Sequence, residues 1–110
     1  MALFKSHKKP EPNETEIIGS WELIENKVKK DENCDRIEHL ISQYFIKKAV
    51  TKDGWESLYQ DPLDLRFWEH TYPNSAWHGG GPPALINISE EKAKKKYNFK
   101  DNNGDPWLIT

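Results

Sequence analysis

The stretch GWESLYQDPLDLRFWEHTYPNSAWHGGGPP, residues 54–83, decides the fold because it holds three of the five tryptophans of this 110-residue chain. Within it, residues 55–60 and 66–72 are short and rich in aromatic side chains, which is typical of β-strands. Between them lies Asp61-Pro62-Leu63-Asp64, where the proline excludes a central strand and favours a turn. The stretch therefore predicts a hairpin-like pair of strands, followed by an ordered loop over residues 73–83.

Before this stretch, the spacing of apolar residues predicts one principal helix that begins after Asp31. Aspartate is a favoured N-cap, and Glu32 adds a negative charge where the helix dipole favours one. The apolar positions that follow recur every three or four residues, so they form one stripe that packs against a sheet. These positions are Cys34, Ile37, Leu40, Ile41 and Tyr44.

Shorter patterns predict further strands. Residues 17–24 have the composition of a first strand, and Glu25-Asn26 can turn the chain into a return at residues 27–29. A strand over residues 45–51 is followed by Asp53-Gly54, which suits a two-residue hairpin turn. That turn would place three pairs of residues opposite each other: Lys52 and Trp55, Val50 and Ser57, and Lys48 and Tyr59.

Residues 84–88 are predicted to add an edge strand, and Ser89 to begin a short lysine-rich helix that ends near Tyr97. The predicted fold class is therefore α+β: a small antiparallel sheet packed on one principal helix, with a short second helix near the C-terminus. We predict a flexible N-terminal tail over residues 1–15, one folded domain over residues 16–97 and a C-terminal extension over residues 98–110.

Length and composition exclude several classes of protein. A single domain of 110 residues is too small for a large enzyme fold. No apolar run approaches the ~20 residues of a membrane-spanning helix, and the first residues lack an apolar signal segment, so we expect a cytosolic protein. Cys34 is the only cysteine, which excludes an internal disulfide and a cysteine-based zinc cluster.

The formal net charge of −2 is unevenly distributed. Residues 10–91 contain sixteen acidic and eight basic side chains, which gives this acidic body a charge of −8, and lysine-rich segments flank it. Such a charge keeps a protein surface solvated. It also suits an acidic face that binds a basic partner, and composition leaves both interpretations open. Direct binding of nucleic acid is disfavoured, because an acidic body repels phosphates.

Residue types that catalyse reactions in other proteins occur here without their usual companions. Trp77-His78-Gly79-Gly80-Gly81 is similar to the oxyanion loop of esterases, but the chain has no G-x-S-x-G nucleophile motif. The four histidines lack the spacing of metal ligands. Asp61, Asp64 and Glu69 lie near one another in sequence, but carboxylates that flank a turn are usually solvated caps rather than general acids or bases. We therefore predict no enzyme activity, no metal site and no cofactor.

Five sequence segments follow one another with short gaps between about Glu16 and Tyr97. They are GSWE at 19–22, the helix at 34–40 with RIE at 36–38, GWESLYQDP at 54–62, RFWEHTYP at 66–73 and HGGGPP at 78–83. Together they resemble the immunity protein 27 family of bacterial polymorphic-toxin and contact-dependent growth inhibition systems. Their combination and order make the resemblance specific. Asp64-Leu65-Arg66 departs from the family pattern, in which a glycine is expected between the aspartate and the arginine.

The resemblance implies a small α+β cytoplasmic inhibitor that binds and neutralises one cognate toxin domain, without contacting nucleic acid or membrane. Toxins of this kind are often nucleases, whose cationic phosphate-binding groove an acidic inhibitor complements. The predicted toxin contacts are Glu56, Asp61, Asp64, Glu69 and Trp77. The residues assigned mainly to the scaffold are Gly54, Trp55, Pro62, Trp68, Gly79, Gly80, Gly81 and Pro82. The alternative function is a small non-catalytic module that binds a peptide or protein in a groove formed by the aromatic loop.

Overall fold

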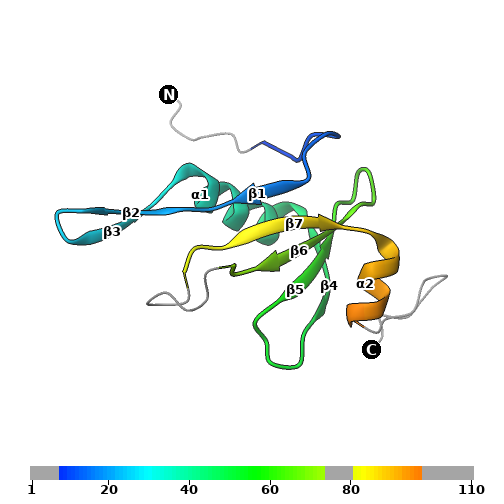
Figure 1. Ribbon diagram of the computed structural model, residues 1–110. Coiled ribbons are helices and arrows are strands. Elements are labelled where there is room, and N and C mark those ends of the chain that lie inside the picture. The colour runs from blue at the N-terminus through cyan, green and yellow to red at the C-terminus, as the bar shows by residue number, and fades with distance from the viewer. Residues whose placement is uncertain (1–7, 74–80, 98–110) are drawn as a thin grey trace.

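The structure, a computed structural model, describes residues 8–73 and 81–97 (Figure 1). Within these two ranges the strands are β1 (Glu16–Ile18), β2 (Trp21–Ile24), β3 (Lys27–Lys30), β4 (Ile46–Val50), β5 (Ser57–Gln60), β6 (Phe67–Thr71) and β7 (Ala84–Ile88). The helices are α1 (Glu32–His39) and α2 (Glu90–Tyr97), and a π-helical turn, η1 (Leu40–Tyr44), continues α1.

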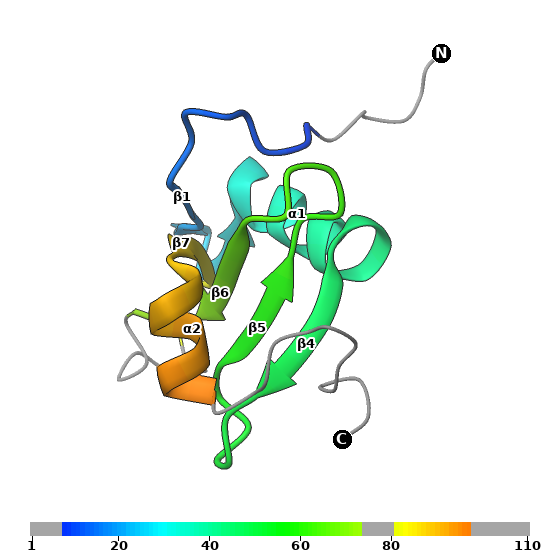
Figure 2. The ribbon, with the colours of Figure 1, turned by 90° about the vertical axis from the view of Figure 1, so that its right-hand side faces the viewer.

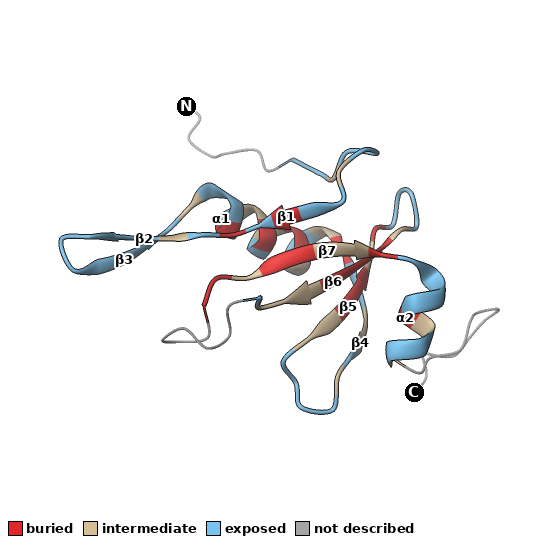
Figure 3. Ribbon diagram, viewed as in Figure 1, coloured by how far each residue is buried: buried red, intermediate tan, exposed pale blue. Residues whose placement is uncertain are grey.

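Five strands form one antiparallel sheet in the order β1-β7-β6-β5-β4. β2 and β3 pair only with each other and form a separate two-stranded ribbon that extends away from the sheet (Figure 1). Apart from Trp21, which is half-buried, every residue of the ribbon strands is exposed (Figure 3). The arrangement confirms the predicted α+β class, with one principal helix and a short second helix.

α1 and α2 lie on opposite faces of the five-stranded sheet (Figure 2). Because neighbouring strand residues point to opposite faces, β5 and β6 supply buried side chains to two separate cores. The core on the α1 face contains Ile17, Ile37, Leu40, Phe45, Tyr59, Trp68 and Leu85. The core on the α2 face contains Leu58, Phe67, Ile88 and Ala93.

The principal helix begins as the sequence predicts. Asp31 is its N-cap, because the Asp31 carboxylate accepts a hydrogen bond of 2.9 Å from the backbone N–H of Cys34. Cys34, Ile37 and Leu40 are fully buried. Ile41 and Tyr44 pack against the same core, which confirms the predicted stripe. Ser89 likewise accepts a hydrogen bond of 3.1 Å from the N–H of Lys92 at the start of α2.

Two predicted strand assignments are wrong. Residues 17–24 form two strands in different sheets, because the strand is interrupted at Gly19. The Gly19 N–H donates to the carbonyl of Pro83 at 2.9 Å. A Cβ at this position would lie 2.7 Å from the Cys34 sulfur, so only glycine lets the backbone pack this closely against Cys34. β7 is not an edge strand either, since it lies between β1 and β6 and leaves β1 at the edge.

The β4–β5 hairpin follows the predicted register only near its turn. Val50 lies opposite Ser57 as expected. A bulge at Lys48 then shifts the register, so that Lys47 rather than Lys48 lies opposite Tyr59. The connection is also longer than two residues, because the backbone N–H of Thr51 donates to the carbonyl of Glu56 at 2.9 Å and leaves four residues, 52–55, in the loop.

Two arginines bind residues 8–14 to the folded domain, although the sequence predicts a flexible tail there. The Arg36 guanidinium binds both carboxylate oxygens of Glu14, at 2.8 and 2.9 Å, and holds the pKa of Glu14 down at about 2. Arg66 donates to the backbone carbonyls of Glu14 and Glu11 at 2.7 and 2.9 Å. The described part of this segment is therefore attached to the domain. The predicted C-terminal extension, 98–110, lies outside the described residues.

Candidate functional site

An open groove of about 390 Å³ lies at the end of the sheet where β4 turns into β5. Among the described residues it is lined by Asp53, Trp55 and Glu56 from the turn and by Thr71 and Tyr72 at the end of β6. Trp55 exposes 53% of its surface. Tryptophan and tyrosine are over-represented among the residues that dominate binding energy at protein–protein interfaces, so this groove is the leading candidate for a contact site.

The turn that carries Trp55 is held by its own hydrogen bonds. One oxygen of the Asp53 carboxylate accepts from the Thr51 hydroxyl at 2.7 Å and from the backbone N–H of Trp55 at 3.0 Å. The N–H of Gly54 donates to the carbonyl of Thr51 at 2.9 Å. Gly54 has a φ of +80°, which a residue with a Cβ adopts only with strain. The sequence therefore fixes the position of Trp55 through Asp53 and Gly54.

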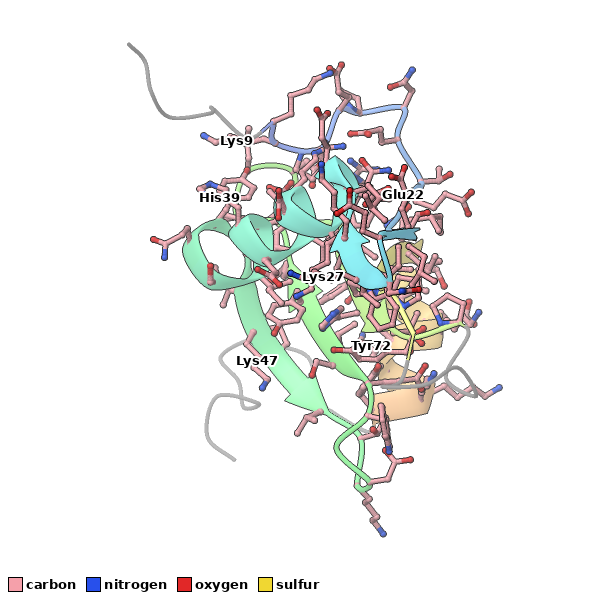
Figure 4. All side chains as sticks on the ribbon, turned by 90° about the vertical axis from the view of Figure 1, so that its left-hand side faces the viewer. Lys9, Glu22, Lys27, His39, Lys47 and Tyr72 are labelled. Carbon is pink, nitrogen blue, oxygen red and sulfur yellow. The ribbon has the colours of Figure 1, made fainter. Side chains whose placement is uncertain are left out.

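A row of rings connects the groove with the core. Trp55 meets Tyr72 edge to face with ring centroids 5.7 Å apart, and Tyr72 lies 5.1 Å from His70. His70 in turn lies 6.4 Å from Tyr59, which belongs to the core on the α1 face. Figure 4 labels Lys47, which lies in β4, and Tyr72, which directly follows β6. Burial, with a smaller contribution from the positive charge of Lys47, lowers the pKa of His70, so this ring stays neutral to a lower pH than an exposed histidine does.

A charged network on the α2 face supports one wall of the groove. The Lys96 ammonium lies 2.8 Å from a carboxylate oxygen of Glu56 and 2.6 Å from one of Glu69. The Thr71 hydroxyl donates to Glu56, and the Tyr97 hydroxyl donates to Glu69 at 2.8 Å. The network thus ties the turn, β6 and α2 together around a single lysine.

The carboxylates beside the groove are ionised at neutral pH. Hydrogen bonds from the Thr51 hydroxyl and then from the Trp55 N–H lower the pKa of Asp53. Hydrogen bonds from Lys96 and then Thr71 lower the pKa of Glu56. Burial opposes the charge on Lys96, but the two glutamates outweigh it and raise the pKa of this lysine. The groove therefore presents negative charge beside an aromatic surface.

Two of the predicted toxin contacts, Glu56 and Glu69, belong to this network. The Glu69 side chain is 9% exposed and the Glu56 side chain 29%, so Glu56 reaches the groove while Glu69 lies beneath it. In the sequence, the C-terminal lysines lie outside the acidic body. The fold brings Lys96 into it, because α2 packs back across the sheet. Toxin contact by Glu56 stays a prediction, and Glu69 has an internal role.

Asp61 and Asp64 lie at the opposite end of the sheet, in the turn between β5 and β6. Asp61 is only 1% exposed, and its carboxylate accepts from the Tyr44 hydroxyl at 2.7 Å and from the N–H of Leu63 at 2.8 Å. A partner cannot reach a carboxylate buried in this way, so Asp61 is better explained as an internal cap. Asp64 is partly exposed and pairs with Arg66 at 2.8 Å, so contact by Asp64 stays a prediction.

Of the residues assigned to the scaffold, Trp68 is fully buried in the core and Gly81 has a φ of +77°, as a structural glycine would. Pro82 is buried, whereas Pro62 is exposed at the β5–β6 turn. Trp55 was assigned mainly to the scaffold, and this stays a prediction, although more than half of its surface is exposed. Three predicted residues, Trp77, Gly79 and Gly80, lie outside the described residues.

Among the described residues, no group of three or more histidine, cysteine, aspartate or glutamate side chains is placed to hold a metal ion. Neither α1 nor α2 has the length and apolar composition needed to cross a bilayer. The features gathered at the groove are those of a surface that binds another molecule: exposed aromatic rings, ionised carboxylates and a turn fixed by hydrogen bonds.

Comparison with protein families gives this domain its class. The family model described as Immunity protein 27 matches residues 23–89, more than half of the chain, and the chain belongs to that family. No curated protein and no solved structure shows significant similarity to the chain. The match includes the turn, β5, β6 and β7, and hence all the described residues that line the groove. Membership of an immunity protein family supports a toxin-neutralising role.

Proposed function

We propose that this chain acts in the bacterial cytoplasm as the immunity protein of a polymorphic-toxin or contact-dependent inhibition system, where it binds and inhibits a cognate toxin domain with nuclease activity. The family match carries the toxin-neutralising part of this proposal. We expect the gene directly upstream to encode a large protein whose C-terminal domain is the toxin. The chain itself performs no catalysis and needs no cofactor.

The charge distribution supports a nuclease as the target. Residues 10–91 have a formal charge of −8, and a nuclease needs a cationic groove to bind phosphates. An acidic inhibitor is attracted to such a groove over long range, which raises the association rate. Lys96, which lies outside this range, offsets part of the charge by pairing with Glu56 and Glu69.

A second candidate function is a non-catalytic module that binds a peptide. The aromatic groove favours it, since about 390 Å³ lies within the ~300–1,000 Å³ range typical of ligand pockets. The two functions differ in their partner. The immunity protein binds a folded toxin domain that is encoded beside it. A peptide module would bind short unfolded segments as tightly as it binds a folded domain.

The proposed electrostatic attraction predicts a salt-dependent association rate. In surface plasmon resonance against the upstream-encoded toxin domain, the association rate should fall about tenfold or more between roughly 0.05 and 0.5 M salt, because the Debye length shrinks to a few ångströms. The dissociation rate should change much less. Asp64→Asn removes one exposed charge while an amide oxygen can still accept from the backbone N–H of Arg66, so it should lower the association rate slightly.

Wild-type binding to an inactive toxin domain with its native cationic groove is the reference for this series. An association rate that does not change with salt would show that the acidic body serves solvation alone.

A further inference from the structure

We propose that the groove beside Trp55 receives an arginine side chain of the toxin, whose guanidinium stacks on the Trp55 ring and pairs with the Asp53 carboxylate. The inference rests on the proposed function, because it takes the toxin to be the partner. It names the chemistry that the partner must place in the groove.

The Trp55 ring is fixed before any partner binds. An exposed tryptophan contributes more binding energy when its position is already fixed, since ordering a free side chain on binding costs entropy. Here the Asp53 hydrogen bonds, the +80° φ of Gly54 and the edge-to-face contact with Tyr72 already fix the ring. Trp55 is therefore a preorganised anchor with more than half of its surface available.

Negative charge surrounds the Trp55 ring. Glu56 and Glu69 share the single cation Lys96. Within the described residues no salt bridge joins Asp53, and the hydrogen bonds from the Thr51 hydroxyl and the Trp55 N–H both go to one of its oxygens, Oδ1. The other oxygen remains able to accept from a partner. Asp53, Glu56 and Glu69 thus place three carboxylates around one lysine, and this excess of negative charge next to an aromatic face selects a cation.

An indole ring beside a carboxylate favours arginine over lysine. A guanidinium is planar, so it can stack on an indole ring and at the same time donate two hydrogen bonds to a carboxylate. A lysine ammonium is more strongly hydrated and offers a point charge without a stacking face. Tryptophan is the aromatic residue that binds cations best. Arginine is also abundant in proteins that bind phosphates, which is the class of toxin proposed above.

The test measures affinity for the upstream-encoded toxin domain by surface plasmon resonance. Trp55→Ala should raise Kd about 30-fold or more, mainly through faster dissociation, as expected of a central interface residue. Trp55→Phe keeps an aromatic face and should lose less. Asp53→Asn keeps an acceptor for the turn hydrogen bonds and removes the charge, and it should raise Kd about tenfold.

Matched controls lie away from the groove. Leu63 is 77% exposed in the turn at the other end of the sheet, so Leu63→Ala removes exposed apolar surface of a similar kind. Glu91→Gln removes one exposed charge at the start of α2. Both controls should bind within about twofold of the wild type. Thermal melts of every variant show whether a loss of binding comes from a loss of folding. Trp55→Phe is the mildest change in the series.

The arginine is then identified from the toxin side. Each surface arginine of the toxin domain is replaced by alanine. The Kd of each toxin variant is then measured with the wild-type chain and with Trp55→Ala. One arginine should show a strongly non-additive loss with Trp55, because removing either member of a contacting pair already abolishes the contact. Additive losses at every arginine, or unchanged Kd for Trp55→Ala, would overturn the inference and leave the proposed function standing. If the wild-type chain itself fails to bind the toxin, the proposed function fails instead.

Discussion

Trp68→Ala is expected to destabilise the domain by about 3–5 kcal/mol, the usual cost of removing a large aromatic side chain from a core. Trp68 is 0% exposed and lies in β6, in the middle of the five-stranded sheet. Its ring stacks on Phe45 with centroids 6.1 Å apart, and the Arg66 guanidinium lies 5.0 Å from it. Alanine would leave a cavity between the sheet and α1 that the surrounding side chains cannot fill without moving the helix.

Trp68→Phe should cost clearly less than Trp68→Ala. The indole nitrogen of Trp68 is buried without a hydrogen-bond partner among the described residues. A phenylalanine side chain fills less of the core, but the substitution also removes this unsatisfied donor, so the two effects partly offset each other. Urea unfolding followed by circular dichroism measures both variants, and the exposed Trp55→Ala serves as the control with a small effect. Equal stability of Trp68→Ala and the wild type would show that Trp68 is not part of a packed core.

Asp61→Ala is expected to destabilise the domain by about 2–4 kcal/mol, although it removes no apolar surface. The Asp61 carboxylate accepts from the Tyr44 hydroxyl and from the N–H of Leu63, and hydrogen bonds to charged groups contribute about 1.5–3 kcal/mol each. Burial, together with the bond to Asp61, raises the pKa of Tyr44 to about 12, so the hydroxyl donates at every ordinary pH. Alanine breaks this link between η1 and the β5–β6 turn.

Asp61→Asn separates the capping role from the charge. An amide oxygen can still accept both hydrogen bonds, so this variant should lose far less stability than Asp61→Ala. Asp64→Ala, in the same turn but partly exposed, is the matched control and should cost less than about 1 kcal/mol. Denaturant midpoints of the four proteins decide the matter. A loss for Asp64→Ala as large as for Asp61→Ala would mean that the turn, rather than the buried carboxylate, provides the stability.

Patterns that are local in sequence predict most of the helices, strands and turns of this fold. The Asp31 cap and the stripe from Cys34 to Tyr44 depend on residues within one helix, and both are confirmed. The Glu25-Asn26 turn is confirmed too, because both residues adopt the positive φ that such a turn requires. The bulge at Lys48 was not predictable, since the composition of β4 carries no signal for an extra residue.

The site was predicted less well than the fold because its contacts join distant residues. Lys96 meets Glu56 and Glu69 only after α2 packs across the sheet, and no spacing in the sequence indicates this. Arg36 and Arg66 bind Glu14 from 22 and 52 positions away in sequence. Trp55 was assigned mainly to the scaffold because residues shared by a whole immunity family more often maintain the fold than contact a toxin that varies, but the turn held by Asp53 leaves more than half of its surface exposed. That turn was the available signal, since a fixed loop tip seldom buries its side chains.

The central claim is that this chain neutralises a toxin, and growth of bacteria tests it most directly. Cells express the C-terminal toxin domain encoded directly upstream, either alone or together with this chain, and an inactive variant of the toxin controls for the burden of expression. We expect growth arrest with the toxin alone and growth close to that of the control when the chain is present. Equal growth arrest in both cultures, with the chain expressed and folded, would contradict it.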